Sequence, residues 1–496
     1  MHARSPMRAL VIDTLAIVAL QLGCHVSNAS DGSDGASTSH TSGSDTTDGS
    51  PTTGMFQCAD SARCTFVLAS QTLDDRIDVF LARSSDGDMQ IPYRGSVDVD
   101  LKPNPMGDNS GELLDEPYGL AVANGALYVM LGHYPTRTAG SLLSFPLSMF
   151  ASALPGTTLG KDTYFASGEF IAPVSGVALG ELEPIFVLAH PSGRLLVAVL
   201  NNDLLLSEDQ WTNPGKLLVV DPHTPDIVGT FELTGLDNVG CTAAWGIVAL
   251  DEHIHSIALA CDGGDDIAVL DVSGVGEGTP SAAAASLTGC IADLPFPDKR
   301  VRFFAPDGSG GVLAVEAPGV PLGTENTRLW WFDGGCEQVD FGEIGADVLA
   351  DVRTVVHVRG DATTPSRHWL LASDGPPAIQ VVVAGNDAAP ALCGKLEGLD
   401  VYWTGDDGEP IAPYALALTS ARDGLAIGAG PREAIADAPG YGRVLFGDVM
   451  ESSDPCGESS DVLVRVVDLT DAAGSVEAND PGTWRRAPNV LAIHEP

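Results

Sequence analysis

Two histidines, His253 and His255, have the spacing that most directly suggests metal chemistry. Residues two apart on a β-strand project from the same face, and metal-binding histidine pairs are often arranged in this way. The only nearby third ligand is Cys261, which the cysteine pattern below assigns to a disulfide. Without a third ligand, the pair favours the solvent-exposed end of a hairpin over a metal site.

Two Glu-Pro pairs begin apolar stretches at matching places, Glu116-Pro117 and Glu183-Pro184. Proline is tolerated at the first residue of a strand, so the simplest interpretation is that each pair starts one. Residues 307–311, Asp-Gly-Ser-Gly-Gly, superficially resemble a serine protease motif. No pattern places a histidine and an aspartate with that serine, so this segment is predicted to be a turn. His190 also falls in a predicted turn, between two apolar runs.

The net charge of −42 limits the partners of the chain. Phosphate backbones and anionic lipid surfaces repel such a protein, so the charge argues against nucleic acid as a partner. The sequence also contains no phosphate-cradling loop or dinucleotide fingerprint. The acidity fits solubility at a wet cell surface, with cation binding and a saline habitat as alternatives.

The N-terminal segment predicts export. Residues 1–23 combine an early positive charge, from Arg4 and Arg8, with a short apolar run, as in a signal peptide. The end of this run, Leu20-Gln21-Leu22-Gly23-Cys24, resembles a bacterial lipobox, although Gln21 departs from it. That resemblance implies lipidation of Cys24 and anchoring in the outer membrane, on the periplasmic side or at the cell surface; plain secretion is the alternative. Residues 24–54 are almost devoid of apolar residues and predict a disordered linker, which leaves 55–496 as the folded domain.

The cysteines suggest disulfides. Nine are present, and setting Cys24 aside leaves an even number, as expected for an exported protein. Eight cysteines allow 105 pairings. Neighbours in sequence favour Cys58–Cys64, Cys241–Cys261, Cys290–Cys336 and Cys393–Cys456. The second pair is the best supported, because a hairpin about residues 251–253 would bring its members nearly opposite each other; free buried thiols are the alternative for all four.

The apolar pattern predicts an all-β fold, since no long stretch has helical periodicity. Short apolar strands separated by turn residues recur at intervals of roughly 50 to 70 residues. These recurring stretches are 65–70, 118–130, 185–199, 245–260, 303–315, 353–358 and 414–428. The clearest unit is 185–233, with four strands.

Units of this kind predict a β-propeller, because one blade cannot bury both faces of its sheet alone. We expect seven four-stranded blades, with six or eight possible because the first and sixth units are the weakest, and with an array of sandwiches as the alternative. The extra length is expected in loops such as 102–115, 148–182 and 429–442. A final strand at 489–495 is expected to close the ring.

Three segments carry a family resemblance. The segment 189–199, AHPSGRLLVAV, resembles the turn of YVTN-type and lactonase-type seven-bladed propellers, and 215–233 resembles their companion strand pair. The segment 118–129, YGLAVANGALYV, resembles units of NHL and gluconolactonase-like propellers. The resemblance covers about a third of the chain and specifies fold rather than chemistry.

In gluconolactonase-like propellers, a glutamate at the start of an inner strand helps to hold a divalent metal. The resemblance therefore implies Glu116, and by analogy Glu183, as ligands of Ca²⁺ or another divalent cation. The asparagine and aspartate partners of that family are missing here. Ligand sites of propellers lie where inner strands begin, which makes five residues candidates for a channel mouth. They are Tyr118, Trp245, Phe303, Arg353 and Tyr414.

Two functions follow from these patterns. The first is a monomeric envelope lipoprotein, without a cofactor, whose propeller binds an unidentified protein, glycan or small ligand of the envelope or the extracellular space. It would touch the membrane through its lipid anchor only. The second is a metal-dependent hydrolase or lactonase on the same scaffold. Fold alone does not decide between them.

Overall fold

The structure is a computed structural model. The described residues are 64–71, 76–83, 93–99, 117–132, 140–148, 157–160, 184–201, 213, 215–223, 226–233, 243–251, 253–262, 267–276, 286–287, 300–307, 310–317, 327–332, 338–344, 349–359, 366–385, 391–404, 410–431, 442–450, 456, 462–469 and 490–495. The predicted signal peptide, the predicted linker and Cys24 lie outside these residues.

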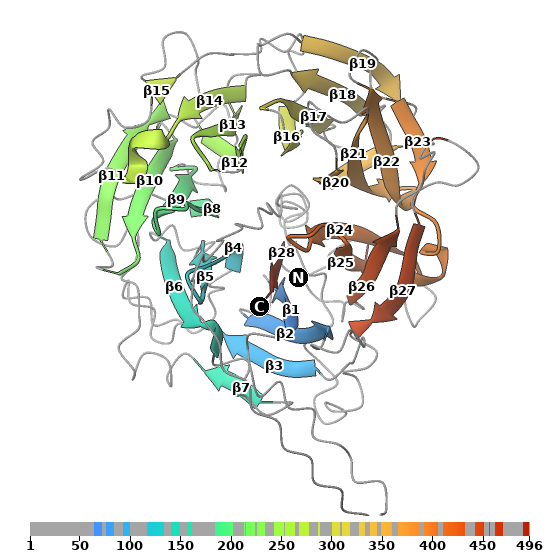
Figure 1. The fold of residues 1–496 in the computed structure, drawn as a ribbon, viewed down its shortest axis with the longest axis horizontal. Helices are drawn as coiled ribbons and strands as arrows, with labels where there is room; N and C mark the ends of the chain where they lie inside the picture. The colour runs from blue at the N-terminus through green and yellow to red at the C-terminus, as the bar shows by residue number, and fades with distance from the viewer. Residues whose placement is uncertain are drawn as a thin grey trace, which may run out of the picture.

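The described strands form seven sheets, which stand around a common centre (Figure 1). We call the sheets blades 1 to 7. Blade 1 contains β28 (Val490–His494), β1 (Thr65–Gln71), β2 (Arg76–Arg83), β3 (Tyr93–Asp98) and β7 (Thr157–Gly160). Blade 2 contains β4 (Pro117–Ala123), β5 (Ala126–Leu131) and β6 (Ser141–Pro146). Blade 3 contains β8 (Pro184–Ala189), β9 (Leu195–Val199), β10 (Lys216–Asp221) and β11 (Asp226–Glu232).

The other four blades each contain four consecutive antiparallel strands. Blade 4 contains β12 (Ala243–Ala249), β13 (Ser256–Asp262), β14 (Ile267–Asp271) and β15 (Ser286–Leu287). Blade 5 contains β16 (Arg300–Pro306), β17 (Val312–Ala317), β18 (Thr327–Phe332) and β19 (Gln338–Ile344). Blade 6 contains β20 (Ala350–Arg359), β21 (Ser366–Gly375), β22 (Pro377–Gly385) and β23 (Ala391–Lys395). Blade 7 contains β24 (Ile411–Leu418), β25 (Gly424–Pro431), β26 (Arg443–Met450) and β27 (Val462–Asp468).

The fold is an all-β propeller, which confirms the predicted fold class. In blades 2 to 7 the first strand along the chain lies nearest the centre and the last strand lies at the rim, whereas in blade 1 β28 lies nearest the centre (Figure 1). Helical structure among the described residues is limited to short pieces, such as the 3₁₀ turns η5 (Ser273–Gly276) and η7 (Asp400–Tyr402). None of the described helices is long and apolar enough to cross a membrane.

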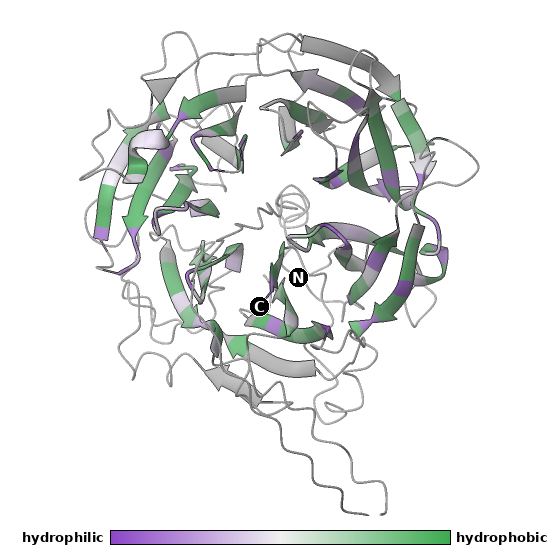
Figure 2. Cartoon of the chain, in the orientation of Figure 1, coloured by the Kyte–Doolittle hydropathy of each residue, from purple (hydrophilic) through white to green (hydrophobic). Residues whose placement is uncertain are grey.

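The apolar strands are explained by burial on both faces. Every residue of β24 is buried, and all five residues of β9 are buried. Strands covered on both faces are apolar along their whole length rather than in alternation. Figure 2 shows the coloured strands largely in green, with hydrophilic residues in shorter purple stretches. Apolar clusters between neighbouring blades join blade 2 to blade 3, blade 6 to blade 7, and blade 7 to blade 1.

The hairpin turns match their residue types. Asn124 and Gly125 join β4 to β5 with φ of 50° and 73°. Positive φ at both central residues is typical of the tight hairpin turn that Asn-Gly favours. In the clearest unit, the turn after β8 contains Gly193 with φ of 84°, and β8 to β11 are the four predicted strands. The hairpin predicted about residues 251–253 is also present, between β12 and β13.

The ring closes through the last strand, as predicted. β28 pairs with β1 in antiparallel register, from Phe66 opposite His494 to Ser70 opposite Val490. The innermost strand of blade 1 therefore comes from the C-terminal end of the chain. This pairing holds the first and last blades together without a covalent bond.

Two expectations about the blades need correction. The sixth unit was expected to be one of the weakest, yet its strands β20 and β21 are ten residues each. Residues 148–182 were expected to be loop, yet 157–160 form β7, which pairs in parallel with β3 at the outer edge of blade 1. The four residues of β7 are mostly polar and do not show the alternation of apolar and polar residues that predicts a strand. The sequence therefore gives little sign of this edge strand.

Candidate functional site

The five predicted channel-mouth residues all lie on inner strands, within the first four residues of each. They are Tyr118 on β4, Trp245 on β12, Phe303 on β16, Arg353 on β20 and Tyr414 on β24. Tyr118, Phe303, Arg353 and Tyr414 are buried, with 3% to 6% of their surface exposed. The side chain of Trp245 lies outside the described part of the structure.

The structure brings two of these candidates together, across the boundary between blades 6 and 7. The guanidinium carbon of Arg353 lies 5.3 Å from the centroid of the Tyr414 ring. An arginine over an aromatic face is attracted by the negative face of the ring, and the attraction is stronger where water is excluded. The sequence did not predict the contact between Arg353 and Tyr414. The two are separated by 60 residues, about the length of one blade repeat, and no local pattern pairs residues over that distance.

A third residue completes this group. Arg353 Nη2 lies 3.2 Å from Asp374 Oδ2, and both side chains are almost fully buried. A buried guanidinium needs a countercharge, because its desolvation is costly unless it is paired. Asp374 occupies the end of β21, next to the tight turn into β22. We call Arg353, Asp374 and Tyr414 the mouth group, which is neutral overall and carries an aromatic face.

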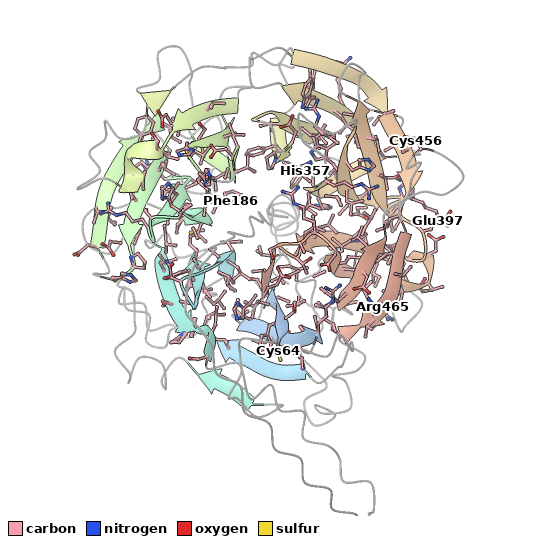
Figure 3. All side chains as sticks on the ribbon, in the orientation of Figure 1. Cys64, Phe186, His357, Glu397, Cys456 and Arg465 are labelled. Atoms are coloured by element: carbon pink, nitrogen blue, oxygen red, sulfur yellow. A yellow bond between two sulfur atoms is a disulfide. The ribbon has the colours of Figure 1, made fainter. Side chains whose placement is uncertain are left out.

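The opposite end of β20 carries a second polar contact between blades 6 and 7. His357 Nδ1 lies 2.9 Å from Arg422 Nη1. A guanidinium can only donate, so Nδ1 of His357 accepts. The His357 ring also packs at a tilt on Trp369, with centroids 5.7 Å apart. Figure 3 shows His357 and Phe186 at the inner edge of the ring, whereas Glu397 and Cys456 lie toward its rim.

Blades 5 and 6 are joined by a buried ion pair that the sequence did not reveal. Asp307 was predicted only as part of a turn, and its backbone does form the turn between β16 and β17. Its fully buried carboxylate also accepts hydrogen bonds from Arg367 and from Trp331 Nε1, the latter at 3.1 Å. The Arg367 guanidinium lies 4.5 Å from the Trp331 ring centroid. An aspartate followed by glycines predicts a turn. No local sequence pattern predicts that this aspartate pairs with Arg367, which lies 60 residues later.

His190, also predicted as a turn residue, forms its turn and in addition contacts the neighbouring blade. Its backbone N–H donates to the carbonyl of Arg194 at 2.8 Å, which closes the turn. The residue is only 8% exposed, and its ring contacts Ser192 in its own turn and Ile254 in blade 4. Burial lowers the pKa of His190 below its usual value.

The histidine pair of blade 4 is exposed, as expected for a hairpin end. The His253 and His255 rings meet edge to face, with centroids 5.6 Å apart. Asp251 Oδ1 lies 3.1 Å from His255 Nδ1 but also accepts backbone N–H groups of its own turn. Among the described residues, no group of three or more His, Cys, Asp or Glu side chains is placed to hold a metal ion. Glu116 and Glu183 lie outside these residues, so their role as ligands stays a prediction.

One of the four expected disulfides lies within the described residues. Cys393 and Cys456 are bonded, with their Cα atoms 4.5 Å apart. Cys64 is also in a disulfide, with a partner outside the described side chains. Cys261 sits on β13 opposite Ala244. The predicted partners Cys58, Cys241, Cys290 and Cys336 lie outside the described residues, so those pairings stay predictions.

Comparisons with known proteins were made for the sequence and for the structure. No protein-family model matches the chain. No curated protein matches it either. Among solved structures, a hypothetical selenium-binding protein from Sulfolobus tokodaii is 12% identical, with a TM-score of 0.48, over 82% of this chain and 91% of that one.

Two further solved structures are similar at the same level. A candidate 6-phosphogluconolactonase from Bacteroides fragilis is 11% identical, with a TM-score of 0.44, over 90% of this chain and 100% of that one. The β-propeller domain of Cps50 (Swd1) from Myceliophteria thermophila is 12% identical, with a TM-score of 0.38, over 71% of this chain and 86% of that one. Such distant similarity concerns the fold, and no function is taken from it.

Proposed function

We propose that this chain is an exported envelope lipoprotein whose propeller is a binding module for a protein, glycan or small ligand. The observation that carries the proposal is the mouth group, in which Arg353 and Tyr414 come from two blades and meet near the start of the inner strands. Arginine and tyrosine are among the residue types enriched where binding energy is concentrated. The sequence provides the tether, because a lipobox-like segment ending at Cys24 precedes a polar linker.

The charges narrow the class of ligand. The cation of Arg353 already faces Asp374, and the whole chain carries a net charge of −42. An anionic ligand would have to approach a strongly negative protein and compete with a buried carboxylate for the guanidinium. The charges at the mouth group therefore suit an uncharged or cationic ligand, and a neutral glycan is the class that we favour.

Binding by the mouth group is tested with the full chain on an array of neutral oligosaccharides. The variant Tyr414→Leu removes the aromatic face and keeps an apolar side chain of comparable bulk. Val401→Ser is the matched control, because Val401 is a 78% exposed apolar residue on η7. We expect Tyr414→Leu to lose binding at least tenfold while Val401→Ser binds as the wild type does. Equal binding by both variants would place the ligand site elsewhere.

The envelope location is tested separately at Cys24. Labelling cells with a fatty-acid analogue should mark the wild-type chain, which should then fractionate with the outer membrane. The variant Cys24→Ser should carry no label and appear in the soluble fraction. A wild-type chain that is exported but unlabelled would favour plain secretion.

A metal analysis of the purified chain addresses the hydrolase alternative. A stoichiometric divalent cation that is lost in Glu116→Gln and Glu183→Gln would support that alternative over a simple binding module. The binding proposal predicts that oligosaccharide binding survives treatment with a chelator.

A further inference from the structure

His190 connects the hairpin turn of blade 3 to the hairpin turn of blade 4. Its Nδ1 lies 3.2 Å from the backbone N of Ser192 and 2.8 Å from Ser192 Oγ. Its Nε2 lies 3.2 Å from the carbonyl oxygen of Ile254. A backbone N–H can only donate and a carbonyl can only accept, so Nδ1 must be the acceptor and Nε2 must carry the proton. The contacts on both sides are therefore satisfied by neutral histidine.

The carbonyl that His190 contacts is held firmly in place. Ile254 is fully buried although it lies in a turn, and its φ is 54°. A β-branched residue with positive φ is strained, so its surroundings must hold it there. Asp251 does so, since its carbonyl accepts the N–H of Ile254 and its carboxylate accepts the N–H groups of His253, His255 and Ser256. The blade 4 turn thus presents the Ile254 carbonyl to His190 in a fixed position.

In blades 5 and 7, the turn position that corresponds to His190 is occupied by residues other than histidine. Asp307 and Thr419 occupy the place of His190 there, because the backbone N–H of each donates to a carbonyl across the same hairpin. Their side-chain oxygens accept the backbone N–H of Gly311 at 2.8 Å and of Gly424 at 2.9 Å. Histidine is the residue type whose ordinary titration falls between pH 5 and 8. Blade 3 alone among these three turns therefore carries a group that responds to mild acid.

We propose that His190 is an acid-sensitive latch between blades 3 and 4. In the neutral state it bonds both turns. A proton taken from solvent by Nδ1 turns the acceptor of the Ser192 N–H into a donor, which sets two donors against each other. The protonated Nδ1 can bond only to Ser192 Oγ, and its positive charge is poorly solvated in this buried site. Opening that brings the ring into water is therefore favoured in acid, and it breaks the bond to the Ile254 carbonyl.

The surrounding charges set where the latch titrates. Burial is the largest influence and lowers the pKa of His190; His255 and Arg194 lower it further, whereas the Ile254 carbonyl and Asp251 act in the opposite sense. Asp271, hydrogen-bonded to Ser273 in the neighbouring turn, is also close to His255. The charged and titratable groups around the latch are Arg194, Asp251, His253, His255 and Asp271.

The sign of the pH effect follows from this direction. A histidine whose pKa is lower in the folded than in the unfolded chain favours folding when it is neutral. The latch therefore contributes fully above about pH 6.5, the ordinary pKa of histidine, and is lost as the pH falls from there through the folded-state pKa. One proton changes the opening equilibrium by at most about tenfold per pH unit in that window.

The test is hydrogen–deuterium exchange of the full chain between pH 7.5 and 5, corrected for the intrinsic pH dependence of exchange. We expect protection of the amides in 250–256 to fall several-fold toward pH 5 in the wild type. In His190→Gln, whose amide can donate to the Ile254 carbonyl at every pH, this dependence should flatten. His223→Gln is the matched control, because His223 is exposed in another turn of blade 3 and should leave the dependence intact.

Two results would overturn the proposal. One is a wild type whose protection at 250–256 does not change with pH. The other is a His190→Gln variant that loses protection in acid as the wild type does. If His190→Gln fails to fold, an NMR titration of the wild-type His190 ring decides instead. A pKa at or above about 6.5 contradicts the latch, and a lower value with Nε2 protonated at neutral pH supports it.

Discussion

Arg83 on β2 and Asp448 on β26 form an ion pair that joins blade 1 to blade 7. Arg83 also lies 3.3 Å from Asp423 in the β24–β25 turn, and its guanidinium stands 5.2 Å from the Phe446 ring centroid. Burial would raise the pKa of Asp423, but hydrogen bonds from Thr419 and Arg83 outweigh it and lower that pKa. The ring is thus closed by this clamp as well as by the pairing of β28 with β1.

Removing Arg83 should weaken the closed ring. The variant Arg83→Met keeps an unbranched stem against Phe446 but leaves Asp448, whose side chain is 9% exposed, with Arg465 as its remaining cation among the described residues. We expect a loss of about 1–3 kcal/mol in the free energy of unfolding, measured by urea denaturation, because a mostly buried carboxylate loses a partner. Lys395→Met is the control, since its ion pair with Asp400 is 50% and 69% exposed and should matter by less than about 1 kcal/mol. If both variants lose the same free energy of unfolding, the contacts of Arg83 between blades 1 and 7 do not stabilise the ring.

The buried pair between blades 5 and 6 should be more sensitive. Asp307→Asn keeps an oxygen for the N–H of Gly311 but removes the charge that faces Arg367. An uncompensated buried guanidinium costs about 3–5 kcal/mol, and the midpoint of denaturant unfolding measures it. Combining Asp307→Asn with Arg367→Met should recover part of that loss. If the double variant is as unstable as the sum of the two single variants, the pair contributes no coupling and this prediction is wrong.

The sequence predicts the strands of this propeller well for a physical reason. Blades are buried on both faces, so their strands are continuous apolar runs, and turn residues such as Asn124 and Gly125 mark the hairpins between them. The closing strand was predictable on the same ground, because 490–494 is apolar after a long polar stretch. β7 was not predictable, because a short polar edge strand has neither feature.

The candidate site was only half predictable. Arg353 and Tyr414 could be listed as channel-mouth residues because the starts of inner strands can be located in the sequence. Their contact with each other, and with Asp374, depends on how neighbouring blades are rotated, and no local pattern encodes this. The same limit applies to Asp307, whose residue type predicts a turn but not its bond to Arg367.

The closing strand should act as a separable part of the fold. Deleting 489–496 removes β28, whose Val490 and Leu491 are buried and whose backbone pairs with β1 along five residues. The shortened chain should lose cooperative unfolding, because blade 1 then exposes the edge of β1 to water. A synthetic peptide of residues 486–496 should bind this edge and restore the thermal transition, as followed by fluorescence anisotropy of the labelled peptide. A control peptide with Leu491→Asp should bind at least tenfold more weakly, and equal binding would mean that pairing at this edge is not specific.

The same strand makes ring closure sensitive to pH. His494 stacks on Phe66 with ring centroids 6.3 Å apart, and burial lowers its pKa although Glu495 opposes the shift. Its contribution to stability is therefore complete above about pH 6.5 and is lost as the pH falls from there through the folded-state pKa. Urea denaturation from pH 8 to 5 should show stability falling less steeply in His494→Leu than in the wild type. An unchanged slope would exclude His494, and the combination with His190→Gln separates it from the latch in blade 3.

The disulfide between Cys393 and Cys456 should stabilise the outer edge of blades 6 and 7. It closes a loop across a sequence separation of 63 residues, and cross-links of that size restrict the unfolded chain by about 4 kcal/mol in the entropic model. The variant carrying Cys393→Ala and Cys456→Ala should therefore lose about 2–4 kcal/mol, measured as the denaturant midpoint under non-reducing conditions. A reducing agent should lower the stability of the wild type, and any further effect of that agent on the double variant reports the remaining disulfides. If mass spectrometry of Cys393→Ala finds the new free thiol on a cysteine other than Cys456, the two have other partners and the assignment is wrong.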